Sequence, residues 1–191
     1  MARQVKILRE DILSKKWYTL KKITFEYQEK NGTKHTLTRE AYDRGNGATI
    51  LLYNKARRTV ILTRQFRMPT FINGNPDGML IEACAGLLDL DQPAEAIRRE
   101  TREETGFQID HVEKIFEAYM SPGSVTEILY FFVAEYTAQD RKDDGGGIDN
   151  EDIDVLELPF EKAMQMVSTG EIKDGKTIML LYHAQINNLL G

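Results

Sequence analysis

The sequence predicts an α/β domain, in which helices cover the faces of a mixed sheet, preceded by a β-rich N-terminal region. Short β-branched or apolar segments typical of strands recur along the 191 residues, and three longer segments have the pattern of helices. A Gly-Asn-Gly break at residues 45–47 separates the first strands from the rest of the chain. We therefore predict two domains, residues 1–43 and residues 44–191.

The N-terminal region contains strand-like segments at residues 5–8, 18–28 and 35–42. Asn31-Gly32, flanked by charged residues, predicts a hairpin between the last two. A three-stranded sheet of this size rarely stands alone, so we expect it to pack on the rest of the chain or on a second copy. Trp17 begins the second strand and is expected to anchor a core or an interface.

The larger region alternates strand-like and helix-like segments. Residues 48–53 and 59–66 predict a second hairpin, and residues 71–78 predict a loop because Gly, Asn, Pro and Asp dominate them. The later segments, in chain order, are a strand at 79–85, a helix at 93–106, strands at 111–119 and 128–136, a mobile glycine-rich loop at 138–152, a strand at 155–158, and helices at 160–168 and 177–190.

Composition excludes several classes of function. The net charge is −5, so nonspecific nucleic-acid binding is not expected, and any phosphate site needs local Arg, Lys or metal ions. Cys84 is the only cysteine, which excludes an intrachain disulfide and a thiolate metal site and fits a reducing compartment. The N-terminus lacks a signal-peptide core, and no apolar run approaches about 18 residues. We expect a soluble cytoplasmic protein with no membrane association.

The helix at residues 93–106 has clear boundary signals. Pro93 suits the first helical turn, and Asp91 is predicted to be the N-cap. Gly106 suits the left-handed position that ends a helix. The sequence therefore predicts one continuous helix between these residues.

Three carboxylates of this helix share one face. Glu100, Glu103 and Glu104 lie three and four residues apart, and like charges at this spacing repel by a few tenths of a kcal/mol per pair. A divalent cation such as Mg²⁺ or Mn²⁺ would offset that repulsion. The alternative is a solvated helix in which Arg99 forms ion pairs with its neighbours, and charge alone does not decide between the two.

Residues 170–177 match the letters of a P-loop. A functional P-loop follows a strand and opens a helix, whereas here a helix is predicted to precede the match and only 14 residues follow Thr177. We therefore do not expect an NTPase. Lys176 of this segment is still a candidate for binding an anion.

The pattern of Arg99, Glu100, Glu103, Glu104 and Gly106, with Gly86 upstream, resembles the signature of the Nudix hydrolases. The similarity spans roughly residues 38–160 and is closest to the branch that cleaves ADP-ribose and nucleotide sugars, in particular its bacterial members that act on GDP-mannose. The supporting matches are Arg39-Glu40, Gly47-Ala48, Arg64-Gln65-Phe66-Arg67, Glu82-x-x-Ala85-Gly86 and Ser121-Pro122-Gly123. The resemblance implies a Nudix-type α/β/α sandwich with a mixed sheet, plus an N-terminal antiparallel sheet used in dimerisation.

The resemblance also implies site residues. Glu100, Glu104, Glu151 and the Ala85 carbonyl are expected to hold Mg²⁺ or Mn²⁺. Glu151 is expected to activate water, with Asp152 or Glu127 as rivals. The expected catalytic residues are Glu100, Glu103, Glu104 and Glu151, and the expected substrate contacts are Arg67, Ala85, Gly86, Leu87, Glu104, Glu127, Asn150, Glu151 and Lys176, with Trp17, Thr38, Arg39 and Glu40 supplied by the exchanged N-terminal region of a homodimer partner.

The expected reaction is Mg²⁺-dependent hydrolysis of a nucleoside diphosphate sugar, with GDP-mannose giving GMP and mannose 1-phosphate. Two alternatives stay open, an ADP-ribose pyrophosphatase and a noncatalytic nucleotide-binding module that regulates another process. The chain also departs from the family pattern, since the segment from Gly86 to Arg99 is one residue shorter and the family's early glutamate falls on Asp91 or Gln92. This departure affects the loop before the helix rather than its carboxylates.

Overall fold

The computed structural model describes residues 2–148 and 151–191, which form two compact units. The first unit ends at Asn46 and also includes Tyr119–Ile128, and the second comprises Gly47–Ala118 and Leu129–Gly191. The return of Tyr119–Ile128 to the first unit is a feature that the sequence did not indicate. Within the described residues, no helix is both long enough and apolar enough to cross a membrane.

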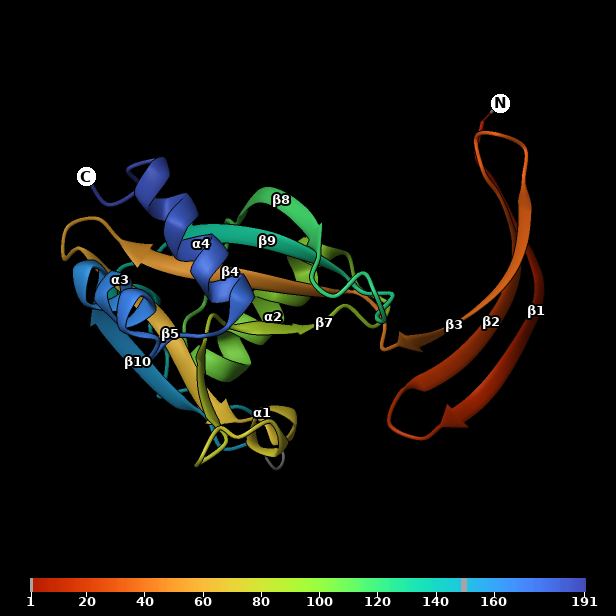
Figure 1. Ribbon diagram of the computed structural model, residues 1–191. Helices are drawn as coiled ribbons and strands as arrows, with labels where there is room; N and C mark the ends of the chain where they lie inside the picture. The colour runs from red at the N-terminus through yellow and green to blue at the C-terminus, as the bar shows by residue number, and fades with distance from the viewer. Residues whose placement is uncertain (1, 149–150) are drawn as a thin grey trace. The chain divides into compact units, whose positions relative to one another are not determined.

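The first unit is built on an antiparallel sheet of order β1-β2-β3, formed by Gln4–Lys15, Thr19–Gln28 and Lys34–Asp43 (Figure 1). The three predicted strands are confirmed, although β1 is much longer than predicted. Tyr42 links Tyr119–Ile128 to this sheet, because its N–H donates to Ser124 O at 2.7 Å and its carbonyl accepts from Thr126 N at 3.1 Å.

The second unit contains a mixed sheet of order β10-β5-β4-β9-β8, with β6 paired to β5 and β7 paired to β4. Strand β4 is parallel to β9 and antiparallel to β5. The strands are β4 (Gly47–Asn54), β5 (Thr59–Phe66), β6 (Met79–Glu82), β7 (Ala85–Leu87), β8 (Glu113–Tyr119), β9 (Ile128–Glu135) and β10 (Asp154–Pro159). The predicted single strand at 79–85 is therefore two strands with different partners.

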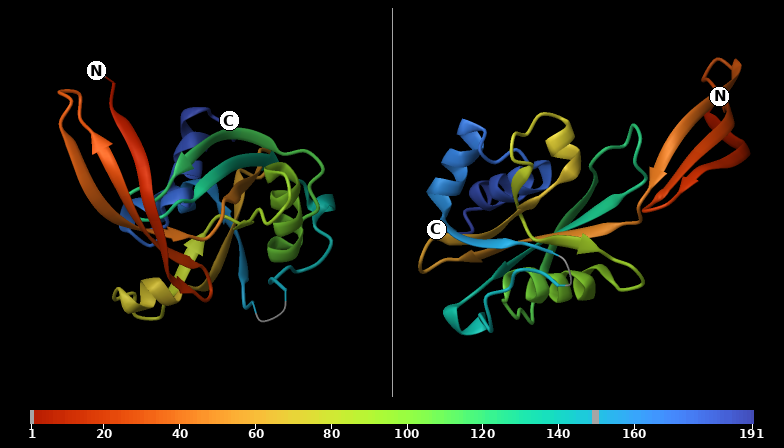
Figure 2. Two further views of the ribbon diagram at one scale, coloured as in Figure 1. Left: turned by 90° about the vertical axis from the view of Figure 1, so that its right-hand side faces the viewer. Right: turned by 90° about the horizontal axis from the view of Figure 1, so that it is seen from below.

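Helices cover both faces of this sheet, as predicted (Figure 2, right). Helix α2 (Pro93–Thr105) lies on one face, and α3 (Phe160–Thr169) and α4 (Gly175–Ile186) lie on the other. Every residue of β4 is buried because helices pack on both of its sides, which explains why its sequence reads as a continuous apolar run. Ile50 and Leu52 of β4 pack with Ile97 of α2 in the core.

Several predicted boundaries change. Pro93 and Gly106 bound α2 as expected, with Gly106 in the left-handed conformation at φ +75°. The prediction that Asp91 is the N-cap is wrong: Gln92 holds that position, and Asp91 instead forms an ion pair with Arg99 at 3.5 Å. The predicted loop at 71–78 begins inside a short helix, α1 (Met68–Ile72), and the predicted glycine-rich loop begins with a 3₁₀ turn, η1 (Ala138–Asp140).

Candidate active site

The candidate site is built around the backbone between β6 and β7. At this break the chain changes partner from β5 to β4, so Ala83, Cys84 and Ala85 need other partners for some of their backbone groups. Side chains from helices on opposite faces of the sheet supply two of them. Thr177 Oγ1 of α4 accepts from Ala83 N at 2.6 Å, and Glu104 Oε2 of α2 accepts from Ala85 N at 3.3 Å.

Glu104 is a buried carboxylate at this break. Helix α2 turns Ala96, Ile97 and Thr101 into the core, and Glu104 lies on the same buried side at the C-terminal end. Burial raises the pKa of Glu104 to about 7, while hydrogen bonds from the Cys84 thiol and Ala85 N lower the pKa by smaller amounts. The same environment raises the pKa of Cys84 well above its usual value. A carboxylate that is costly to ionise here gains from a nearby cation.

Glu100 lies one turn earlier on α2 and packs against Gly86. A Cβ at Gly86 would overlap the Glu100 carboxyl group, so glycine is required for this close approach. Burial raises the pKa of Glu100, and the charges of Glu103 and Glu151 raise it further, while Arg99 lowers it. The electrostatic effect of Glu151 indicates that this acid lies near the helix carboxylates.

Arg99 holds the outer part of the acidic face. Its Nη1 donates to Glu100 Oε1 at 2.9 Å and to Glu103 Oε2 at 3.5 Å, while its Nε lies 3.5 Å from Asp91. The predicted Arg99–Glu103 pair is therefore present, but it is one contact of a wider cluster. Glu103 is the most exposed of the three helix acids, which fits a supporting position better than a central one.

The glycine-rich loop docks on the C-terminal end of α2. Gly146 N donates to Glu104 O at 2.9 Å, and Gly147 N donates to Glu103 O at 3.1 Å. These bonds satisfy helix-end carbonyls that have no partner inside the helix. The sequence predicted a mobile, solvated loop, but these described residues are held by the helix that carries the acids. Glu151 follows, with Oε2 accepting from Ile148 N at 3.1 Å.

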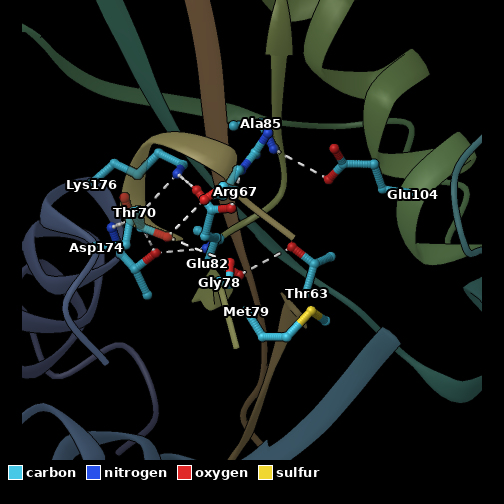
Figure 3. Close-up of polar contacts among 12 residues, drawn as sticks. Thr63, Arg67, Thr70, Gly78, Met79, Glu82, Ala85, Glu104, Asp174 and Lys176 are labelled. Carbon is cyan, nitrogen blue, oxygen red and sulfur yellow. Dashed lines mark hydrogen bonds and ion pairs between the residues drawn. The ribbon is translucent and has the colours of Figure 1, made fainter. Parts of the chain in front are cut away.

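A cluster of alternating charges lies on the other side of the β6–β7 break (Figure 3). Glu82 at the end of β6 accepts from Arg67 Nε at 2.6 Å and from Lys176 Nζ at 2.5 Å. Asp174 also contacts Lys176 at 3.1 Å and accepts from Thr177 N at 3.0 Å. Arg67 and Lys176, both predicted to contact substrate, are thus brought together by a buried carboxylate.

The segment that matches the letters of a P-loop has a different role in this fold. Gly170 ends α3 in the left-handed conformation at φ +79°, and Asp174 is the N-cap of α4. A helix rather than a strand precedes the segment, as predicted. The segment therefore places Lys176 beside Glu82 from the first turn of α4.

The remaining predicted residues fall into three groups. Gly86 and Leu87 belong to β7 beside Ala85. Trp17, Thr38, Arg39, Glu40 and Glu127 belong to the first unit, where Trp17 is 85% exposed and Glu127 lies 3.6 Å from Arg44. Trp17 therefore does not anchor a core within this chain, and its expected place at an interface stays a prediction. Asn150 lies outside the described residues.

Sequence reasoning gave no role to Glu82 or Asp174. Glu82 had a detectable signal, because an acid inside an apolar strand must be paired if the strand is buried. Asp174 had a weaker one as a possible cap before Gly175.

The oxygen atoms at the β6–β7 break could provide some of the ligands of a hard cation. Glu100, Glu104 and backbone carbonyls provide oxygen ligands, which Mg²⁺ and Mn²⁺ prefer. Among the described residues, no group of three His, Cys, Asp or Glu side chains converges closely enough to hold an ion by itself. Mg²⁺ commonly binds through one or two carboxylates and completes its coordination with waters and substrate phosphates. The residues present fit that mode.

Comparison with known proteins identifies matching families and relatives. The NUDIX domain matches residues 43–181, and the GDP-mannose pyrophosphatase NudK N-terminal domain matches residues 4–42. Proteins named GDP-mannose pyrophosphatase from Yersinia enterocolitica and from Enterobacter sp. strain 638 are 59% and 55% identical to the chain, and each alignment covers all of both proteins. The solved structure of an ADP compounds hydrolase has the same fold, with a TM-score of 0.72 and 18% identity over 95% of this chain and 92% of that chain.

The Glu104 pKa leads to a prediction for the metal-free protein. The pKa of a Glu side chain in the unfolded chain is about 4.3, below the folded value of about 7, so the folded state holds the proton more tightly. This contribution to the free energy of unfolding is full below about pH 4.3 and is lost as the pH rises to about 7. In EDTA, the free energy of unfolding of the unsubstituted protein, measured with urea, should decline by something of the order of 3 kcal/mol over this pH range. Glu104→Gln should lack this decline.

Glu95→Gln is the control for this experiment, because Glu95 is an exposed acid in the first turn of the same helix. It should keep the pH dependence of the unsubstituted protein. Equal slopes for Glu104→Gln and Glu95→Gln would contradict the burial-driven pKa.

Proposed function

The chain belongs to the Nudix family of hydrolases, and on that premise we propose that it hydrolyses the pyrophosphate bond of GDP-mannose to give GMP and mannose 1-phosphate. The observation that carries this proposal is the full-length similarity to proteins named GDP-mannose pyrophosphatase, which includes the N-terminal unit. In the reaction, a water oxygen bonds to one phosphorus, the bridging P–O bond breaks, and the water protons are shared between the two products.

We assign the metal to the acidic side of the β6–β7 break. Glu100, Glu104, Glu151 and the Ala85 carbonyl would hold a divalent ion, with Mg²⁺ as the physiological metal and Mn²⁺ as a substitute. Such an ion supplies positive charge against the phosphate oxygens and makes water more acidic. Support comes from the oxygen-rich donor set and from burial of Glu104, whose carboxylate form benefits from a cation.

The other roles are those that the family resemblance implies. Glu151 orients the attacking water and accepts its proton, and Glu103 supports the acidic face through Arg99. Arg67 and Lys176 bind the two phosphates, and Gly86 and Leu87 line the substrate through their backbone. In the remaining assignments, Glu127 binds the sugar, Asn150 contacts substrate, and Trp17, Thr38, Arg39 and Glu40 of a second copy bind the base and ribose.

A substrate panel tests the reaction. Incubation with Mg²⁺ and GDP-mannose, ADP-ribose, NADH or ATP, followed by product separation, should release GMP fastest from GDP-mannose. Glu104→Gln, purified identically, should lack this activity and so exclude a contaminating enzyme. Preferred release of AMP from ADP-ribose would favour the alternative substrate. Tight binding of GDP-mannose without turnover would favour a noncatalytic module.

Substitution of Glu151 tests the assignment of the base. Glu151→Gln retains the size of the side chain but cannot accept the proton, so turnover should fall by orders of magnitude while substrate affinity survives. Asp152→Asn is the matched control and should keep most of the activity. Near-normal turnover of Glu151→Gln, or a larger loss in Asp152→Asn, would move the role to another acid.

The N-terminal sheet supports a homodimer. Its first strand exposes large apolar side chains, including Ile7 at 63% and Ile12 at 60%, and apolar surface of this kind is typical of an interface. Light scattering at micromolar concentration should give twice the 21.9 kDa chain mass. Ile7→Asp should shift the protein toward monomer. Ile186→Asp, at an apolar residue of α4 that is 80% exposed, should leave the dimer intact.

A monomer at these concentrations would remove the explanation for an exchanged N-terminal region.

A further inference from the structure

Glu82 is a buried anion shared by two cations. Its side chain is 5% exposed, and each of its oxygens accepts from a different cation, Oε2 from Arg67 Nε and Oε1 from Lys176 Nζ. A buried carboxylate is costly unless its partners fully compensate it. Arg67 and Lys176 are long, flexible side chains, and both are drawn here to the two oxygens of one carboxyl group.

The position of Glu82 is fixed by the backbone on both sides. Its carbonyl accepts from Thr63 Oγ1 at 3.2 Å, and the next residue, Ala83, donates its N–H to Thr177 Oγ1 at 2.6 Å. Glu82 also pairs with Thr63 across β5 and β6. Because β5 holds the main chain at Glu82 and α4 holds it at Ala83, Glu82 is a fixed reference point for the cations.

Both cations keep donors for a ligand while bound to Glu82. Arg67 uses Nε for Glu82, and a guanidinium carries four further N–H groups on its two Nη atoms. Lys176 contacts Glu82 and Asp174, and an ammonium has three N–H groups. Arg67 is also 39% exposed, so its outer edge is open to solvent. Neither cation has to leave Glu82 in order to bind phosphate oxygens.

We propose that Glu82 is a positioning residue that holds Arg67 and Lys176 together as a preorganised receptor for the two adjacent phosphates of a pyrophosphate group. The inference rests on the proposed function for the identity of the substrate. A pyrophosphate presents oxygens on neighbouring phosphorus atoms and therefore needs two cations close together. Glu82 supplies that closeness before the substrate arrives, which removes the cost of ordering two long side chains on binding.

Asp174 completes the arrangement from α4. Its Oδ2 accepts from Thr177 N and Oγ1, at 3.0 and 2.6 Å, and contacts Lys176 Nζ at 3.1 Å. The same carboxylate thus caps the helix and restrains Lys176. The two acids hold the ammonium from β6 and from the start of α4.

Competition is the opposite outcome, in which Glu82 occupies the cations and weakens phosphate binding. The two roles predict opposite signs for Glu82→Gln, which removes the charge at nearly constant size. If Glu82 positions the cations, this substitution raises KM; if Glu82 competes, it lowers KM. The rigid backbone around Glu82 and the remaining donors on both cations favour positioning.

The experiment measures binding and turnover separately. The binding probe is methylenediphosphonate, which resembles pyrophosphate and is not hydrolysed, titrated calorimetrically in Mg²⁺. Turnover uses GDP-mannose. The variants are Glu82→Gln, Lys176→Ala, their combination, and the control Glu157→Gln, which removes a carboxylate that pairs with Arg57 at 2.8 Å and accepts from Thr59 Oγ1, at the start of β5, at 3.0 Å.

Glu82→Gln should weaken diphosphonate binding and raise KM by about tenfold or more, with a smaller change in kcat, while Glu157→Gln leaves both unchanged. Because Glu82 acts through the cations, adding Glu82→Gln to Lys176→Ala should cost much less than it costs alone. If Glu82→Gln does not fold, Glu82→Asp is the substitute, because it retains the charge but retracts it by one methylene. Like Glu82→Gln, it should raise KM and weaken diphosphonate binding.

Unchanged or tighter diphosphonate binding in a folded Glu82 variant would overturn the inference, as would an equal effect in the Lys176→Ala background. Failure of the proposed function looks different. Diphosphonate binding that depends on Glu82, without release of GMP from GDP-mannose, would retain the receptor and reject the substrate. Turnover of GDP-mannose by a protein that does not bind diphosphonate would retain the reaction and reject the receptor.

Discussion

The second unit depends on the need to satisfy the backbone where β6 ends and β7 begins. Cys84 O accepts from Ile50 N and Thr49 Oγ1 of β4, each at 3.0 Å, while side chains from helices on opposite faces bind the neighbouring N–H groups. An unpaired buried N–H is costly, so these contacts couple α2 and α4 to one short stretch of chain. The acidic and basic halves of the candidate site meet there because side chains of both helices bind backbone N–H groups of the same short stretch.

Burial gives the two halves different electrostatic characters. On the α2 side, desolvation raises the pKa of Glu104 to about 7, so its carboxylate form favours a cation. On the α4 side, Arg67 and Lys176 are matched by Glu82 and Asp174, which makes those four groups neutral as a set. Of the groups on the two sides of the break, only those beside α2 therefore carry negative charge without a matching cation. The proposed reaction of a pyrophosphate at this break would therefore need positive charge from a bound cation on the α2 side.

Local patterns in the sequence could be read and distant pairings could not. The carboxylates of α2 were predicted because spacings of three and four residues define a helical face without knowledge of the rest of the fold. The end of α2 was also predicted, since Gly106 has a local conformational cause. Glu82 and Lys176 are separated by 94 residues, and their contact requires the strand break and the cap of α4 together. The docking of the glycine-rich loop was not predicted for the same reason, because its partners are backbone carbonyls of a distant element, helix α2.

The neutrality of the basic cluster bears on how the site can select its substrate. Two unpaired cations would attract any anion, with an affinity that follows charge and falls steeply with salt. Cations already held by Glu82 and Asp174 gain less from charge alone and more from a ligand whose oxygens meet the donors that remain. Such a site favours the geometry of two linked phosphates over a single phosphate of similar charge. In the proposed receptor, Glu82 and Asp174 would therefore weaken the attraction of anions in general and increase the discrimination among them, and the remaining binding energy would come from the proposed metal and from the groups attached to the pyrophosphate.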